Sequence, residues 1–204
     1  MNRVIVQGTV IGPGRPRESR NGNLYWKGGL AFRRVRYHYV PVTAFGRVAT
    51  WMARFAGQPV AVEGVLEDAD RGDYRTLAVI ASDMVPLKRP VFESPKGWPV
   101  IEGSAEVDLS GWLAVPPRPA GEATLLRLKF KVPLGREWRS GFATVVVHGE
   151  DLTDMEKGAP VFVRGVLQQR FKKKGVDVHA LEVVPGLDRE RYEAREDDLL
   201  EEVV

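Results

Sequence analysis

Basic and aromatic residues alternate in two short stretches of the chain. Residues 169–174 (QRFKKK) place one ring among four cations, and residues 33–39 (RRVRYHY) interleave three arginines with two tyrosines. Cationic side chains neutralise phosphates, while aromatic rings receive nucleobases at about 1–3 kcal/mol per stacked base. Such stretches therefore indicate a surface for single-stranded nucleic acid. The alternative, a solvated strand face with its turn, stays open at this point.

Two further segments have a similar composition. The loop of residues 15–20 (RPRESR) leads to Tyr25 and Trp26. It either closes over a bound nucleic-acid strand or is merely exposed. Residues 136–139 (REWR) place a tryptophan between arginines. The candidate contacts from the residues themselves are Arg15, Arg17, Arg20, Tyr25, Trp26, Arg33, Arg34, Arg36, Tyr37, Tyr39, Lys129, Lys131, Arg136, Trp138, Arg139, Arg170, Lys172, Lys173 and Lys174.

The other tryptophans carry different expectations. Trp51 and Phe55 lie on the apolar face of a predicted helix over residues 47–56, so both are expected in the core. Trp98 is expected to pack between domains. Whether the Trp112 side chain faces the core or the surface stays open.

Catalytic and metal-binding patterns are missing from the sequence. There is no cysteine, and the three histidines include no i,i+4 pair, which disfavours a transition-metal site. The patterns G-x-x-x-x-G-K-S/T, H-E-x-x-H and G-x-S-x-G do not occur. Residues 68–73 (DADRGD) lack the spacing and the final glutamate of a calcium loop. We therefore expect a protein that is not an enzyme and has no cofactor.

The net charge of +3 is distributed unevenly. Residues 1–90 carry 14 Lys and Arg against 7 Asp and Glu, whereas residues 186–204 carry 3 against 8. A basic body with an acidic tail suits a protein that binds polyanions, and plain solubility is the alternative. No apolar run approaches the roughly 18 residues of a membrane span, and the N-terminus alternates like a strand instead of a signal peptide. A cytoplasmic location without membrane contact is expected.

An internal repeat organises the chain. Residues 57–66 (GQPVAVEGVL) and 158–167 (GAPVFVRGVL) share G-x-P-V-x-V-x-G-V-L at an offset of 101 residues. Two further strand-like segments, each centred on a glycine, recur in the same order at an offset of 103. Anchors in constant order indicate two copies of one small domain.

Each copy has the same predicted order of elements. A helix lies between the third and fourth of five strands, and the second copy has a shorter helix near residues 151–157. This is the order of an OB-fold, a small Greek-key barrel. The sequence therefore predicts an all-β chain with short helices, built as tandem OB-folds from two five-stranded Greek-key barrels. The predicted ranges are 1–89 for domain 1, 90–104 for a proline-containing linker, 105–187 for domain 2 and 188–204 for an acidic tail.

Three segments of the first copy resemble the bacterial single-stranded DNA-binding protein family. They are MNRVIVQGTV at the start, VTAFGRVA at residues 42–49 and PVAVEGVL at residues 59–66. The likeness covers nearly all of residues 1–87 and continues, more weakly but in order, over residues 105–187. With two OB domains, the chain resembles the Deinococcus–Thermus type of that family. This resemblance implies a homodimer with four OB-folds.

The resemblance also implies which aromatic residues stack on bases. In the family, single-stranded DNA wraps around the barrels. The matching positions are Tyr39 and Phe45 in the first copy, and Phe142 and His148 in the second. Phe171 matches a stacking tryptophan in the hairpin between the fourth and fifth strands. The first copy has EDADRGD at residues 67–73 instead, so the two domains are expected to bind unequally.

The leading hypothesis is sequence-tolerant binding of single-stranded DNA, which the protein would protect or organise in replication, recombination or repair. A specialised paralogue, such as a primosomal replication protein, and a tandem-OB adaptor that binds proteins are the alternatives. In the family an acidic tail docks partner proteins. Residues 188–204 keep the acidic and apolar character but lack the terminal Pro-Phe. Docking of replication or repair proteins, or packing of a tail helix on the same chain or a second subunit, both stay open.

Overall fold

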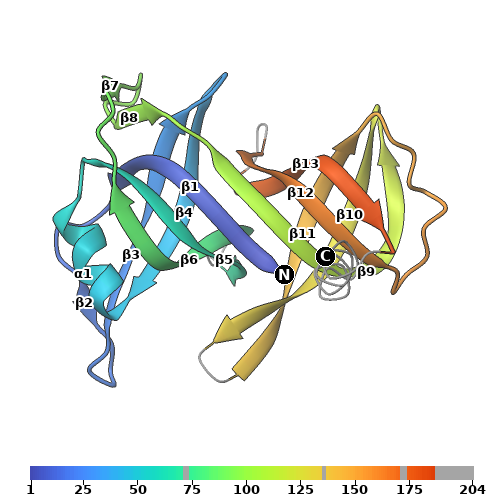
Figure 1. Cartoon of the computed structure of the whole chain (residues 1–204), viewed down its shortest axis with the longest axis horizontal. Helices are drawn as coiled ribbons and strands as arrows, with labels where there is room; N and C mark the ends of the chain where they lie inside the picture. The colour runs from blue at the N-terminus through green and yellow to red at the C-terminus, as the bar shows by residue number, and fades with distance from the viewer. Residues whose placement is uncertain (71–73, 135–136, 171–173, 187–204) are drawn as a thin grey trace, which may run out of the picture. The chain divides into compact units, whose positions relative to one another are not determined.

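The computed structural model describes residues 1–70, 74–134, 137–170 and 174–186. These residues form thirteen strands and one helix (Figure 1). They divide into two compact units. The first-repeat unit comprises Arg3–Glu106 and Val166–Asp177, and the second-repeat unit comprises Met1–Asn2, Val107–Gly165 and the segment from Val178. No helix within the described ranges is long and apolar enough to cross a membrane.

Five strands close into a barrel in the first-repeat unit. They are β1 (Asn2–Ile11), β3 (Leu24–Arg33), β4 (Tyr37–Phe45), β5 (Pro59–Asp70) and β6 (Arg75–Pro86), with helix α1 (Gly46–Arg54) between β4 and β5. Around the barrel the order is β1, β3, β4, β6, β5 and back to β1. The β4–β6 pair is parallel and the other neighbours are antiparallel. This closure, with a helix after the third barrel strand, is the OB-fold arrangement that the sequence predicts.

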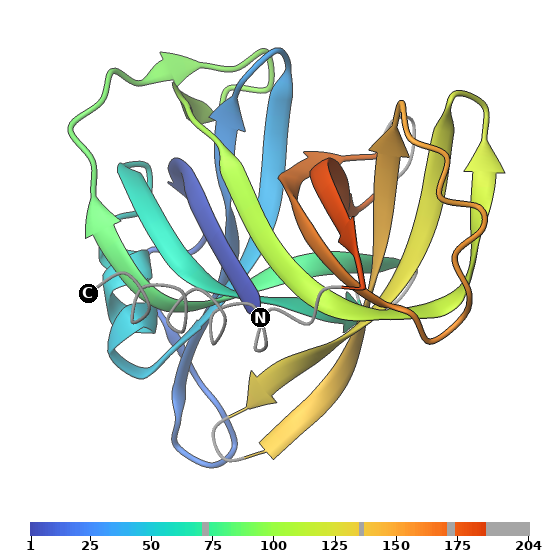
Figure 2. The same ribbon diagram turned by 45° about the vertical axis from the view of Figure 1, so that its right-hand side comes forward.

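The second sequence repeat has the same strand topology. Its strands are β9 (Ala105–Ala120), β10 (Ala123–Leu134), β11 (Glu137–His148), β12 (Pro160–Gln169) and β13 (Val176–Pro185). The order is β9, β10, β11, β13, β12 and back to β9, with β11 and β13 parallel. The far ends of β10 and β11 project from the barrel of their own unit as a two-stranded arm, which Figures 1 and 2 both show in yellow to gold.

The prediction of a helix over residues 151–157 is wrong. The described chain between β11 and β12 contains turns and no helix. The Asp151 carboxylate accepts hydrogen bonds from the Thr153 hydroxyl (2.6 Å) and backbone N–H (3.0 Å), and these bonds lower the pKa of Asp151. Such local bonds from an aspartate favour a turn over a helix.

Helix α1 buries a different set of residues from the one expected. Ala49, Met52 and Ala53 are buried, whereas Trp51 and Phe55 are only half-buried. The guanidinium carbon of Arg47 lies 4.6 Å from the centroid of the Trp51 ring. The short helix therefore seals the barrel through small side chains and one methionine, and Trp51 lies at its edge.

The segment expected as a linker contains two strands. Val100 and Ile101 are buried in β8 (Pro99–Glu102), which pairs in parallel with β3. A second strand, β7 (Phe92–Glu93), pairs with β8. Two buried apolar residues in succession explain why this stretch joins the sheet of the first-repeat unit. The predicted domain boundaries themselves stay a prediction.

One repeated glycine allows two strands to approach closely in each barrel. A Cβ at Gly64 would lie 2.1 Å from the carbonyl oxygen of Ile80, and one at Gly165 would lie 2.5 Å from that of His179. In the first-repeat unit the β5–β6 register also shifts between Glu63 and Gly64. A glycine at a bulge or close approach is expected in barrel strands, so its recurrence has a structural cause.

Candidate nucleic-acid interface

The outer face of β3 and β4 carries the aromatic candidates of the first-repeat unit. Tyr25 lies opposite Phe45, and Arg33 lies opposite Tyr37. Tyr39 follows Tyr37 by two positions, and residues two apart in a strand share a face. One sheet face therefore holds three tyrosines, a phenylalanine and an arginine.

The rings on this face differ in their exposure. Phe45 is 52% exposed and Tyr37 is 40% exposed, whereas Tyr25 and Tyr39 are half-buried. The ring of Tyr39 crosses Gly29, where a Cβ would lie 2.4 Å from the tyrosine Cζ. The missing side chain at Gly29 thus leaves room for the Tyr39 ring against the sheet.

Trp26 must be removed from the candidate contacts. It lies on the opposite face of β3 from Tyr25 and is 0% exposed. Its indole N–H donates a 2.8 Å hydrogen bond to the carbonyl of Pro13. A buried ring whose polar atom is already bonded has no face for a base. The sequence placed Trp26 beside Tyr25, but strand alternation sends adjacent residues to opposite faces.

Most arginine candidates of this unit are exposed. Two lie in the β3–β4 turn, and Arg17 belongs to the short strand β2 (Arg17–Glu18), opposite Tyr25. Arg33 instead donates a 2.9 Å hydrogen bond to Glu102, which raises the pKa of its guanidinium. Exposed ion pairs contribute only about 0–1 kcal/mol, so a phosphate can replace this carboxylate. The exposed arginines are Arg15, Arg17, Arg20, Arg34 and Arg36.

The outer face of the second-repeat barrel brings together Trp112, Lys129 and Phe142. Lys129 of β10 lies opposite Trp112 of β9 on one side and Phe142 of β11 on the other. The Nζ of Lys131 lies 5.9 Å from the centroid of the Trp112 ring. The guanidinium carbon of Arg127 lies 5.4 Å from the Phe142 ring centroid. Two rings therefore flank a lysine, and each ring has a further cation above it.

This row lines a groove of about 580 Å³ within the second-repeat unit. Its walls include Trp112, Lys129, Lys131, Ser140, Phe142 and Lys157. A base stacked on either ring would leave its phosphate near the lysines, which is the arrangement that suits single-stranded nucleic acid. We call these residues the β9–β11 groove.

The projecting arm of β10 and β11 carries another pair of candidates. Trp138 is 66% exposed, and Arg139 is exposed beside it. Trp138 lies opposite Pro133, and Arg139 lies opposite Val132. Arg136 lies outside the described residues. The arm thus presents a large ring and a cation to solvent.

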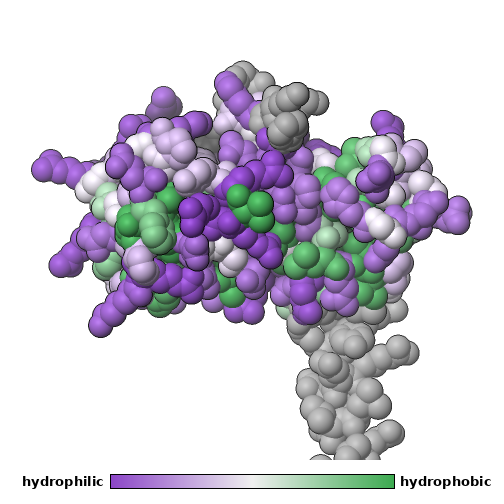
Figure 3. Space-filling view, turned by 90° about the horizontal axis from the view of Figure 1, so that it is seen from above, coloured by the Kyte–Doolittle hydropathy of each residue, from purple (hydrophilic) through white to green (hydrophobic). Residues whose placement is uncertain are grey.

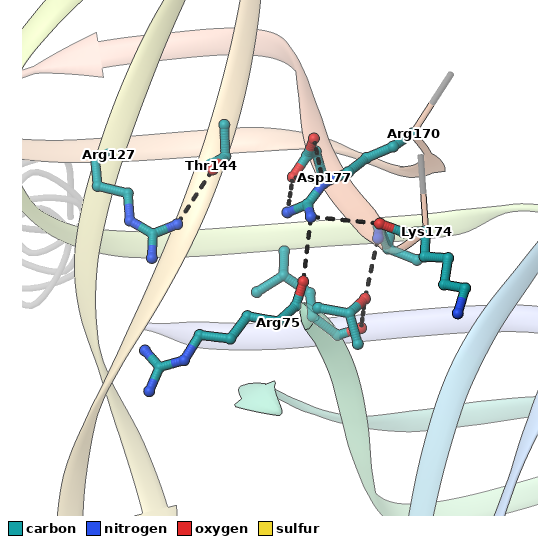
Figure 4. Close-up of polar contacts among 9 residues, drawn as sticks. Arg75, Arg127, Thr144, Arg170, Lys174 and Asp177 are labelled. Atoms are coloured by element: carbon teal, nitrogen blue, oxygen red, sulfur yellow. Dashed lines mark hydrogen bonds and ion pairs between the residues drawn. The ribbon is translucent and has the colours of Figure 1, made fainter. Parts of the chain in front are cut away.

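The side chain of Arg170 forms hydrogen bonds within the protein and is only partly exposed. Its guanidinium donates to both carboxylate oxygens of Asp177, at 2.7–3.0 Å, and to the backbone carbonyl of Arg75 at 3.1 Å (Figure 4). The bonds to Asp177 raise the pKa of Arg170. The local sequence could not reveal this partner, because the carbonyl comes from β6.

The same segment is held to β6 by a second buried bond. The backbone N–H of Val176 donates to the hydroxyl of Thr76 at 3.0 Å, and Thr76 is 2% exposed. Lys174 is exposed, with its Nζ 5.5 Å from the centroid of the Tyr74 ring. Phe171, Lys172 and Lys173 lie outside the described residues. Residues 166–177 belong to the first-repeat unit, so these bonds order the base of the hairpin within that unit.

We expect Arg170→Ala to lower the free energy of unfolding by about 1–3 kcal/mol, because it leaves the largely buried carboxylate of Asp177 without its cation. Arg164→Ala is the matched control. Arg164 pairs with Asp108 and Glu182, but its side chain is 55% exposed. Its removal should therefore lower the free energy of unfolding by only about 0–1 kcal/mol. Urea unfolding measures both. Equal losses in the two variants would contradict a clamping role for Arg170.

The sequence did not single out Trp112, Lys157 and Arg127 as members of the candidate interface. Alternation could have found Arg127, because it shares a face with Lys129 and Lys131. Trp112 lies on β9, which pairs with β10, and Lys157 lies in the turns after β11; only the strand register and the path of that loop bring them to the groove. His148 takes the place of Phe45 in the second copy, and its ring lies 5.9 Å from that of His179.

Apolar side chains reach the surface in small separate areas among hydrophilic ones on the face that Figure 3 shows. The rings of Trp112 and Phe142 each have a cation within 5.9 Å of their centroid. Isolated apolar residues at a surface are ordinary. Rings paired with cations on one sheet face are a more specific feature, since they match the chemistry of a nucleotide.

Two solved structures of the single-stranded DNA binding protein from Thermus aquaticus resemble the whole chain. The wild-type protein is 24% identical with a TM-score of 0.62, and the match covers 91% of this chain and 92% of that one. A deletion variant is 25% identical with a TM-score of 0.62, covering 92% and 95%. No protein-family model and no curated protein matches the chain. The expected all-β tandem OB-fold and the resemblance to the two-domain Deinococcus–Thermus type are confirmed.

Proposed function

We propose that this chain, which is built like the two-domain single-stranded DNA binding protein of Thermus aquaticus, binds single-stranded DNA with little sequence preference. The observation that carries the proposal is the β9–β11 groove, where Lys129 lies between the rings of Trp112 and Phe142. Every base has a face that can stack on a ring, and every nucleotide brings a phosphate. The protein binds its ligand and performs no chemistry on it.

The test is a titration of intrinsic tryptophan fluorescence with oligo-dT at two salt concentrations. We expect strong quenching, because Trp98, Trp112 and Trp138 are exposed and stacked bases quench indole emission. The logarithm of the binding constant should fall by about 0.7 for each phosphate contact per logarithm of salt. A blunt duplex serves as the control ligand. If oligo-dT fails to bind even at low salt, the proposal is wrong and the protein-binding adaptor becomes the better hypothesis.

We also propose a cytoplasmic homodimer with four OB-folds that protects or organises single-stranded DNA in replication, recombination or repair. The support is the resemblance of the whole chain to a two-domain protein. The acidic residues 188–204 lie outside the described residues, and we propose them as a docking segment for replication or repair proteins. Light scattering on the full chain and on a chain ending at residue 186 tests the dimer, and a monomeric mass for the full chain would contradict it. Pull-down of replication and repair proteins with the same two chains tests the docking segment, and equal capture by both would contradict it.

A further inference from the structure

A hairpin that follows the first barrel extends its sheet. Strand β8 pairs with β3, so that Glu102 lies opposite Arg33. Strand β7 pairs with β8, so that Phe92 lies opposite Val100. Val100 is 1% exposed and anchors the hairpin. The face that carries Arg33 on β3 therefore continues onto β8 and β7.

Two large rings lie exposed on this hairpin, which we call the β7–β8 hairpin. Phe92 is 44% exposed and Trp98 is 38% exposed. The Trp98 ring centroid lies 5.7 Å from that of Tyr39, at an angle of 48°. The Nζ of Lys96 lies 5.5 Å from the Trp98 ring, and the guanidinium carbon of Arg33 lies 5.5 Å from the Phe92 ring. Each exposed ring thus has its own cation.

The turn of the hairpin holds Trp98 in place. The N–H of Ser94 donates to the carbonyl of Trp98 at 2.8 Å, and the N–H of Trp98 donates to the Ser94 hydroxyl at 3.0 Å. Gly97 closes the turn with a bond to the Ser94 carbonyl and a φ of 74°, a conformation that favours glycine. A backbone ordered before binding, with the ring already against Tyr39, reduces the conformational entropy that is lost when a base stacks on Trp98.

The charges around the hairpin favour an anionic ligand. Lys88, Arg89 and Lys96 are exposed there, against the exposed carboxylates of Glu93 and Glu102. Glu102 is already paired with Arg33 at 2.9 Å. The β5–β6 hairpin of the same unit is poorly suited to an anionic ligand with bases. Its residues 67–73 (EDADRGD) contain no aromatic residue and carry four carboxylates.

We propose that the β7–β8 hairpin is a base-stacking subsite for single-stranded DNA that continues the strand path from Tyr39 across Trp98 and Phe92. It supplies the first-repeat unit with the ring-and-cation pairs that its β5–β6 hairpin lacks. The subsite rests on the proposed function. Continuity with Tyr39 and the cations beside each ring favour DNA over a protein partner or a second copy of the chain.

The test measures binding of a fluorescein-labelled oligo-dT by anisotropy, which does not depend on tryptophan emission. Trp98→Ala and Phe92→Ala should each weaken binding about 5- to 150-fold, the equivalent of one lost base stack. Trp98→Phe keeps a ring and should stay within about threefold of the natural chain. Val91→Ala is the control, because Val91 is 45% exposed beside Phe92 but offers no ring.

The outcomes separate the subsite from the proposed function. If the natural chain binds oligo-dT and both alanine variants bind equally well, the subsite is wrong and the function stands. If the natural chain does not bind, the proposed function fails and the subsite fails with it. A dimer that dissociates in Trp98→Ala, with unchanged DNA binding per chain, would identify a protein interface and overturn the subsite.

A second measurement tests the subsite on the natural chain, in case an alanine variant fails to fold. The natural chain is irradiated with oligo-dT that carries 5-iodo-deoxyuridine, and the cross-linked peptides are mapped by mass spectrometry. We expect a cross-link in the peptide that contains Trp98. Cross-links to the β9–β11 groove without any to Trp98 or Phe92 would overturn the subsite.

Discussion

Trp26→Ala is expected to lower the free energy of unfolding by about 3–5 kcal/mol, the usual cost of deleting a large buried ring. Trp26 is 0% exposed, and a Cβ at either Gly12 or Gly28 would lie within 2.4 Å of its ring. These two glycines fit closely around the indole, and neither has a side chain that could fill the space left by its removal. Urea unfolding followed by circular dichroism measures the loss.

Trp26→Phe is the matched variant for this prediction. It keeps a buried ring and loses the hydrogen bond to the exposed Pro13, whose carbonyl can bond to water instead, so a loss of about 1 kcal/mol is expected from the bond. Oligo-dT affinity of the folded Trp26→Phe protein should match that of the natural chain. A variant of normal stability that binds DNA poorly would show that Trp26 contacts the ligand and would contradict its place in the core.

The double variant Trp112→Ala, Phe142→Ala is expected to lose most of the affinity of the second-repeat unit for single-stranded DNA. Each ring removed from the β9–β11 groove should cost about 1–3 kcal/mol of binding free energy. Both rings lie beside Lys129, so their effects are expected to be coupled. Anisotropy titrations of the natural chain, both single variants and the double variant give the coupling energy.

Lys129→Gln provides the comparison for the charge between the rings. This substitution should reduce the slope of the logarithm of the binding constant against the logarithm of salt by about one phosphate contact, and it leaves the stacking rings in place. The ring variants should instead weaken binding at all salt concentrations with little change in slope. An unchanged affinity in the double variant would show that the β9–β11 groove is not where DNA binds.

The periodicity of the sequence predicted the barrels correctly. The repeat of G-x-P-V-x-V-x-G-V-L marked the same strand twice, and because a one-residue slip would turn the apolar residues to solvent, strands of alternating residues favour the register that buries them. Gly64 and Gly165 recur because backbone atoms of the neighbouring strand lie too close for a side chain. The helix expected over residues 151–157 was wrong because a single Asp151–Thr153 turn competes well with so short a helix.

The structure places most of the predicted contact residues at the surface and one of them in the core. Tyr37, Phe45, Lys129 and Trp138 are exposed as a binding surface requires, whereas Trp26 is buried. Basic and aromatic composition does not specify a face, since tyrosine and tryptophan are common both in cores and at surfaces. Whether the exposed candidates contact DNA stays a prediction.

The sequence by itself determined the two-copy architecture, because it depends on a local pattern that repeats along the chain, and it predicted a basic and aromatic surface from composition. Only the tertiary structure decided which residues meet. Arg170 bonds to a carbonyl on β6, 95 residues away, and Trp98 lies against Tyr39 because β8 pairs with β3. Contacts of this kind depend on strand pairing between distant segments, which the composition of neither segment specifies.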